Sequence, residues 1–119
     1  MIGRRFGRIV NISSLAGLVK KPQMIHYATS KAAVIAFTRS CAEAFAPFNV
    51  RVNCVAPGLL EGTRATANLR PEAIETGRKA SLLGKAADKD DVADQVVTMC
   101  RTNTMTGQTL VIDSGRTFH

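Results

Sequence analysis

The sequence is poor in the features that mark several common protein classes. It has three cysteines and no tryptophan, and no apolar run approaches the ~18–20 residues of a membrane helix. The cysteines are odd in number and far apart, and no Cys-x-x-Cys pair occurs, so neither a zinc site nor a disulfide framework is indicated. Reduced, buried thiols in a cytoplasmic protein are expected. We therefore expect no metal site, no export signal and no membrane association.

Acidic residues are the minority charge, with nine Asp and Glu against 16 Lys and Arg, which gives a net charge of +7. Such a balance can attract phosphates, nucleic acid or an acidic carrier protein. No basic run is interleaved with aromatic residues, however, and no nucleic-acid-binding motif appears. The basic residues are therefore interpreted as a solvated surface, and no nucleic-acid partner is expected.

Apolar periodicity and Gly or Pro breaks predict strands that alternate with helices. Strands are expected at 8–12, 49–56 and 108–113, and helices at 27–46, 71–80 and 90–101. This alternation implies three parallel strands with right-handed helical crossovers, an α/β fold in one domain. The first strand is almost wholly apolar, and at the edge of a sheet it would be prone to pair with another chain. The pattern therefore suggests a piece of a larger sheet.

The last predicted helix has an apolar stripe and an acidic start. The stripe is formed by Val92, Val96, Val97 and Cys100. The acidic run at 88–91 is better explained by helix capping than by metal binding.

Tyr27 and Lys31 are four residues apart at the start of the clearest helix, so they are expected on one face, one turn apart. An ammonium close to a phenol stabilises the phenolate, and such a tyrosine can exchange a proton with an alcohol or ketone oxygen. Ser14 follows a strand, where ligand sites of parallel sheets gather, and its hydroxyl can donate to a developing oxyanion. Each feature alone is more often a surface pair or a turn.

Several motifs nevertheless occur together, in order along almost the whole chain. They are Asn11-Ile12-Ser13-Ser14 with Gly17, Tyr27-Ala28-Thr29-Ser30-Lys31, Val50-Arg51-Val52-Asn53, Ala56-Pro57-Gly58, Asp91-Val92-Ala93, and Thr106-Gly107-Gln108 before Val111-Ile112-Asp113-Ser114-Gly115. This set resembles the short-chain dehydrogenase/reductase family, whose motif is a serine, a spacer and Tyr-x-x-x-Lys. The ending is most similar to that of the 3-oxoacyl-carrier-protein reductases.

The resemblance implies a partial Rossmann-like fold, the carboxy-terminal half of a doubly wound sheet, and NAD or NADP as cofactor. It implies that Tyr27 is the general acid/base, that Lys31 also hydrogen-bonds the cofactor ribose, and that Ser14 holds the substrate oxygen.

The same resemblance implies a nicotinamide pocket after the second strand. Pro57, Gly58 and Leu60 would shape it, with Thr63 one position later than the threonine of the usual pattern. The stretch 61–80 would be the mobile substrate-binding loop.

The family's glycine-rich turn between a strand and a helix does not occur, since Gly3 and Gly7 are not part of one. Without that turn the pyrophosphate of a dinucleotide lacks its main anchor. Residues 1–119 are therefore expected to be a catalytic half-domain, with the nucleotide-binding half absent.

Three functions stay open. The first is a truncated NAD(P)-dependent oxidoreductase that acts on a small-molecule carbonyl or secondary alcohol, with Tyr27 delivering the proton. The second is an esterase-like hydrolase with Ser14 as nucleophile and Tyr27 with Lys31 as its base, although no Gly-x-Ser-x-Gly elbow occurs. The third is a non-enzymatic oligomerisation module. A homo-oligomer is expected because the alanine-rich helix and the first strand favour self-association.

Overall fold

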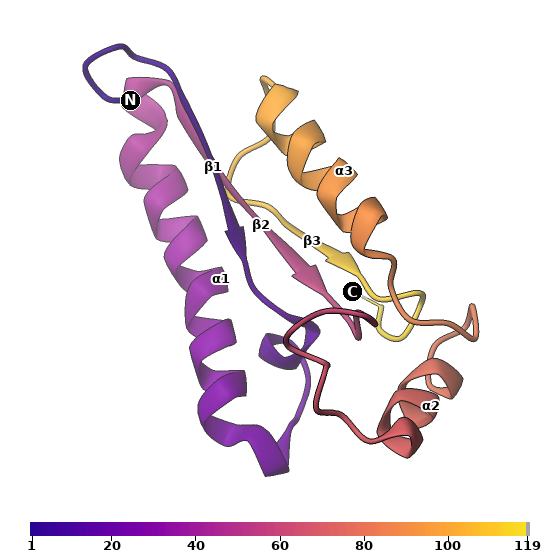
Figure 1. Cartoon of the computed structure of the whole chain (residues 1–119). Coiled ribbons are helices and arrows are strands. Elements are labelled where there is room, and N and C mark those ends of the chain that lie inside the picture. The colour runs from indigo at the N-terminus through magenta and orange to yellow at the C-terminus, as the bar shows by residue number, and fades with distance from the viewer. Residues whose placement is uncertain (119) are drawn as a thin grey trace.

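The computed structural model describes residues 1–118 (Figure 1). The strands are β1 (Gly7–Ile12), β2 (Val50–Pro57) and β3 (Thr109–Ile112), and the helices are α1 (Ile25–Phe45), α2 (Pro71–Lys79) and α3 (Lys89–Arg101). Three short 3-10 turns, η1 (Leu15–Gly17), η2 (Pro22–Met24) and η3 (Ala46–Phe48), flank α1. Each predicted strand and helix is confirmed, with bounds that differ by a residue or two.

The sheet has the order β1-β2-β3, and both strand pairs are parallel. The register aligns Ile12 with Val55 and Pro57 with Ile112, so the three strands end near one another at one edge of the sheet. In Figure 1, α2 lies beyond these carboxyl ends. This is the edge at which ligand sites of parallel sheets form.

Alternate residues of β2 pack against different helices. Val52 belongs to a core with Ala42 of α1, whereas Val55 belongs to a second core with Val92 and Met99 of α3. Figure 1 shows α1 and α3 on opposite faces of the sheet. The central strand is thus covered on both sides, as a parallel sheet requires.

The predicted stripe on α3 is partly wrong. Val92 and Met99 are buried, but Val97 is 46% exposed and Cys100 is also exposed. The face of α3 that packs on the sheet contains Val92 and the positions four and seven residues after it. Val97 and Cys100 lie outside this face. The expectation of buried thiols is also wrong for Cys100.

The acidic start of α3 is explained by capping, as predicted. The Asp88 carboxylate accepts hydrogen bonds from the backbone N–H groups of Asp90, at 2.7 Å, and Asp91, at 3.4 Å. These bonds satisfy two of the N–H groups that a helix start leaves without partners. Within residues 1–118, no group of three or more His, Cys, Asp or Glu side chains could hold a metal ion.

Candidate active site

The chain that leaves β1 is fastened to both β2 and α1. The backbone N–H of Ser13 donates to the carbonyl of Val55 at 2.8 Å. The Ser13 hydroxyl donates to the carbonyl of Lys31 at 2.7 Å. The end of β1 is therefore held against the second turn of α1, although 18 positions separate Ser13 from Lys31 in the sequence.

Ser14 is the cap of the short turn η1. Its hydroxyl oxygen accepts a hydrogen bond from the backbone N–H of Ala16 at 3.1 Å. Within residues 1–118 the Ser14 hydroxyl donates no hydrogen bond, so its proton is available to an incoming acceptor. The side chain is half-buried.

The turn η1 packs directly on α1 through Gly17. A Cβ atom at Gly17 would lie 2.7 Å from the carbonyl carbon of Lys31 and 2.8 Å from the nitrogen of Ala32. Backbone atoms cannot move aside as a flexible side chain can, so only glycine allows this approach. The motif glycine thereby sets the distance between the Ser14 turn and the Lys31 turn.

Tyr27 and Lys31 lie together on α1, as their spacing predicts. The Lys31 ammonium nitrogen is 5.8 Å from the centroid of the Tyr27 ring, within the range of a cation–π contact. The same nitrogen donates to the carbonyl of Ile12, the last residue of β1, at 3.1 Å. An ammonium has three N–H donors, so two remain for other acceptors.

Pro57 and Gly58 bring the end of β2 close to the end of β3. The Gly58 N–H donates to the carbonyl of Ile112 at 2.8 Å. A Cβ atom at Gly58 would lie 2.9 Å from the Cβ of Asp113, so the glycine permits this close approach.

Leu60 and Thr63 form a tight turn after this point. The Leu60 carbonyl accepts a hydrogen bond from the hydroxyl of Thr66 at 2.7 Å, and the hydroxyls of Thr63 and Thr66 are 2.9 Å apart. In the described part of the chain, no hydrogen bond joins Thr63 to Tyr27 or Lys31. Thr63 therefore stabilises its own turn.

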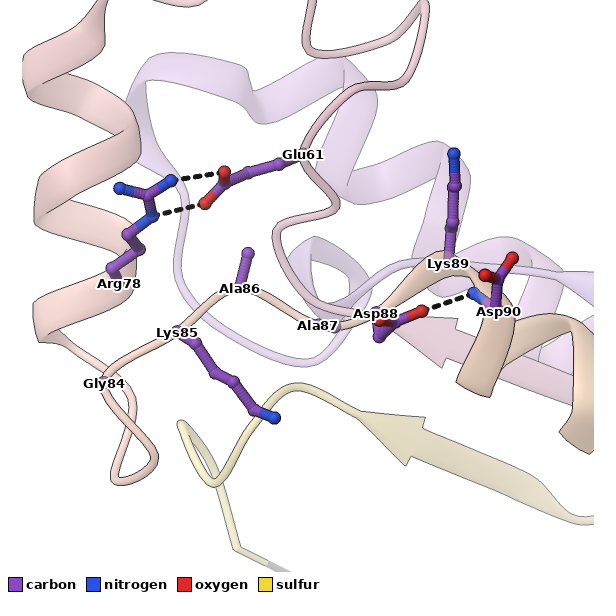
Figure 2. Close-up of a pocket in the computed structure, with 9 residues that line it drawn as sticks. All are labelled: Glu61, Arg78, Gly84, Lys85, Ala86, Ala87, Asp88, Lys89 and Asp90. Carbon is purple, nitrogen blue, oxygen red and sulfur yellow. Dashed lines mark hydrogen bonds and ion pairs between the residues drawn. The ribbon is translucent and has the colours of Figure 1, made fainter.

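An ion pair that no sequence pattern predicted connects α2 to this turn. The Glu61 carboxylate accepts two hydrogen bonds from the Arg78 guanidinium, which lower the pKa of Glu61. Figure 2 shows the pair beside a hollow of about 510 Å³. The hollow is lined by Glu61, Arg78, Gly84, Lys85, Ala86, Ala87, Asp88, Lys89 and Asp90. No local pattern could predict the pair, because 17 positions separate its members.

The Cys54 thiol is not a candidate nucleophile. Cys54 is fully buried in β2, and burial raises the pKa of its thiol. A buried neutral thiol is a poor nucleophile.

Across residues 1–118, no helix has the length and apolar character needed to cross a membrane.

A family model described as "Enoyl-(Acyl carrier protein) reductase" matches residues 1–117. The chain belongs to the short-chain dehydrogenase/reductase family. The relatives that it matches include reductases and dehydrogenases, and the family's Rossmann-like fold agrees with the parallel sheet described above.

Two curated relatives illustrate the likeness. The chain is 39% identical over 117 residues to "3-oxoacyl-[acyl-carrier-protein] reductase FabG" of Aquifex aeolicus, an alignment that covers 97% of this chain and 47% of the relative. It is 39% identical over 115 residues to "Cyclopentanol dehydrogenase" of Comamonas testosteroni, which covers 93% of this chain and 46% of the relative. The chain thus spans about half the length of the curated relatives it matches.

Solved structures of this family agree in fold. A 3-oxoacyl-[acyl-carrier protein] reductase from Brucella melitensis superposes with a TM-score of 0.88 at 35% identity, over 97% of this chain and 44% of that one. The structure titled "ElxO with NADP Bound" superposes with a TM-score of 0.86 at 32% identity, over 98% of this chain and 48% of that one.

The hydrolase alternative finds no support. A serine nucleophile needs a hydrogen-bonded base, and within residues 1–118 the Ser14 hydroxyl is bonded to neither Tyr27 nor Lys31. The relatives named above are reductases and a dehydrogenase.

Proposed function

We propose that this chain carries the proton-transferring site of an NAD(P)-dependent oxidoreductase that interconverts a small-molecule carbonyl and a secondary alcohol. The observation that carries the proposal is the junction of η1 and α1. There the end of β1 holds Lys31 at two points, and Tyr27 and the Ser14 turn lie beside it. Membership of an oxidoreductase family supports the same assignment.

Tyr27 is the general acid/base in this proposal. Its phenol gives a proton to the carbonyl oxygen during reduction and takes one from the alcohol during oxidation. The Lys31 ammonium is 5.8 Å from the centroid of the Tyr27 ring, and in this proposal it is the charged partner of Tyr27 during the proton transfer.

Ser14 holds the substrate oxygen. The N–H of Ala16 fixes the position of the Ser14 oxygen, while the hydroxyl proton remains available for donation. A positioned donor of this kind stabilises the charge that develops on the oxygen as the carbonyl is reduced.

The residues present fit the nicotinamide end of the cofactor. Two N–H donors of Lys31 suit the ribose hydroxyls, and Pro57, Gly58 and Leu60 would line the ring. Because Thr66 already donates to the Leu60 carbonyl, backbone N–H groups near Leu60 would contact the carboxamide in this proposal. Thr63 remains a candidate for the same contact. The nicotinamide, when bound, supplies or accepts the hydride.

The proposal assigns only this end of the cofactor to residues 1–118, which contain no glycine-rich turn from a strand into a helix. Similar structures titled with bound NADP and with bound NAD make both cofactors candidates. The names of several relatives make a 3-oxoacyl thioester the first substrate to test.

Self-association through α1 is part of the proposal. Phe37 is 61% exposed and Ile25 is 69% exposed on this alanine-rich helix. A contiguous exposed apolar patch is typical of contacts between subunits, and in this proposal these two side chains contribute to one. A cytoplasmic location stays a prediction.

The test is cofactor oxidation by the purified chain, with a short 3-oxoacyl thioester and then with small ketones as substrates. Tyr27→Phe removes only the hydroxyl, and it should lower kcat by about 10²–10⁴ because general acid catalysis is lost. Ser40→Ala is the matched control, because among the described residues the Ser40 hydroxyl bonds only within α1, to the carbonyl of Ala36. Wild-type turnover by Tyr27→Phe would overturn the assignment.

A further inference from the structure

We propose that Ser13 is a positioning residue of the same site, acting through Lys31. This inference rests on the proposed function. The feature behind it is a two-point clamp, defined here as the Ile12 carbonyl and the Ser13 hydroxyl, which hold opposite ends of Lys31.

The first point of the clamp holds the Lys31 side chain. The ammonium nitrogen donates to the Ile12 carbonyl at 3.1 Å, which directs the long side chain back toward the end of β1. A lysine side chain otherwise samples many rotamers, so one fixed hydrogen bond restricts where its charge lies.

The second point holds the Lys31 backbone. The Ser13 hydroxyl is 2.7 Å from the Lys31 carbonyl oxygen, and Ser13 is only 3% exposed. A carbonyl oxygen has two lone pairs, so it can accept this bond as well as the helical one. The bond fixes the position of α1 relative to β1, because its donor lies in the loop that follows β1 and its acceptor lies in α1.

The clamp is rigid because Ser13 itself cannot shift. Its N–H donates to the carbonyl of Val55 at 2.8 Å, in the central strand. On the other side, Gly17 touches the Lys31–Ala32 peptide. The Lys31 peptide is therefore held by two segments of one loop, and removal of the Ser13 hydroxyl frees one of them.

Loss of this bond should displace the charge of Lys31 from Tyr27 without removing any group that touches substrate. A misplacement of about 1 Å at a reacting centre can cost about 100-fold in rate. We expect Ser13→Ala to lower kcat by about 10- to 100-fold with little change in the KM for the carbonyl substrate, because Ser14 and the groups that line the substrate site remain in place. The KM for the cofactor should rise, since Lys31 also meets the ribose in the proposed function.

The experiment has two arms on the full chain. In the first, kcat and KM are measured for wild type, Ser13→Ala, Ser13→Thr and Ser40→Ala. Ser13→Thr keeps the hydroxyl and should restore most of kcat, and Ser40→Ala should match wild type because its bond lies within α1. Ser13→Cys keeps the shape with a weaker donor, and it serves if Ser13→Ala does not fold.

The second arm needs neither cofactor nor substrate. Acetic anhydride labelling with mass spectrometry compares Lys31 with exposed Lys20 in the same sample. Ser13→Ala should raise the labelling rate of Lys31, because a shifted Lys31 backbone strains the bond from its ammonium to the Ile12 carbonyl. Full loss of that one hydrogen bond corresponds to roughly fivefold, and the rate of Lys20 should stay unchanged.

The outcomes separate the two proposals. If the wild type is inactive but Ser13→Ala still raises the labelling rate of Lys31, the proposed function is contradicted and the clamp is supported. Unchanged labelling of Lys31 would overturn the clamp whether or not the wild type is active. Raised labelling with unchanged kcat would remove Ser13 from the reaction.

Discussion

The contact between Gly17 and α1 makes a sharp prediction for Gly17→Ala. The new methyl carbon would lie 2.7–2.9 Å from three backbone atoms of Lys31 and Ala32. Carbon atoms in contact prefer about 3.5–4.0 Å, so η1 and α1 must separate by roughly 1 Å. Overpacking of this kind costs about 1–3 kcal/mol, which corresponds to a fall in Tm of roughly 4–12 °C for a chain of this size.

The same displacement moves the Ser14 turn away from Lys31. We expect a loss of about 100-fold in kcat for Gly17→Ala at a temperature where the variant is folded. Calorimetry gives the stability, and cofactor oxidation gives the rate. Gly3→Ala is the matched control, because no atom lies within 4 Å of the position that its methyl group would take.

A Gly17→Ala variant with wild-type Tm and kcat would refute the reasoning, since it would show that η1 does not rest on the α1 backbone. A fall in Tm with unchanged kcat would separate the packing from the chemistry. In that case the Ser14 turn would not need its observed distance from Lys31.

Three further perturbations test other parts of the structure. Met99→Ala should lower the free energy of unfolding by about 2–5 kcal/mol in urea titrations, because Met99 is 2% exposed in the α3 core. Asp113 is partly buried, which raises its pKa, but the hydrogen bonds from Thr117 and nearby N–H groups outweigh burial and hold the pKa below its ordinary value. A lowered pKa adds stability above the unfolded value of about 3.9 that is lost as pH falls through the folded one, so wild type should lose more stability in acid than Asp113→Asn. Glu61→Gln should speed hydrogen exchange across α2 with little change in Tm, and equal exchange in both proteins would show that the exposed pair with Arg78 does not hold the helix.

The predicted elements followed from local patterns. The Val-rich β2 and the alanine-rich α1 have strong periodicities of their own, and Pro or Gly marks their ends. The stripe on α3 was partly wrong because Val97 and Met99 are both apolar, and only the position of the sheet decides which of them is buried.

The site was predictable only where its residues lie close in sequence. Tyr27 and Lys31 share a helix face by spacing alone. The bond from Ser13 to the Lys31 carbonyl and the pair of Glu61 with Arg78 join distant positions, and neither leaves a local pattern. Ser14 was the serine singled out, whereas the buried neighbour that ties β1 to α1 is Ser13.

Deuterium transfer tests most directly whether this chain takes part in hydride transfer with Tyr27 supplying the proton. The chain is incubated with nicotinamide cofactor deuterated at its reactive carbon and with a 3-oxoacyl thioester, and the product is analysed by mass spectrometry. We expect one deuterium on the new carbinol carbon with wild type and almost none with Tyr27→Phe. An alcohol product without deuterium, or equal labelling by wild type and Tyr27→Phe, would contradict it.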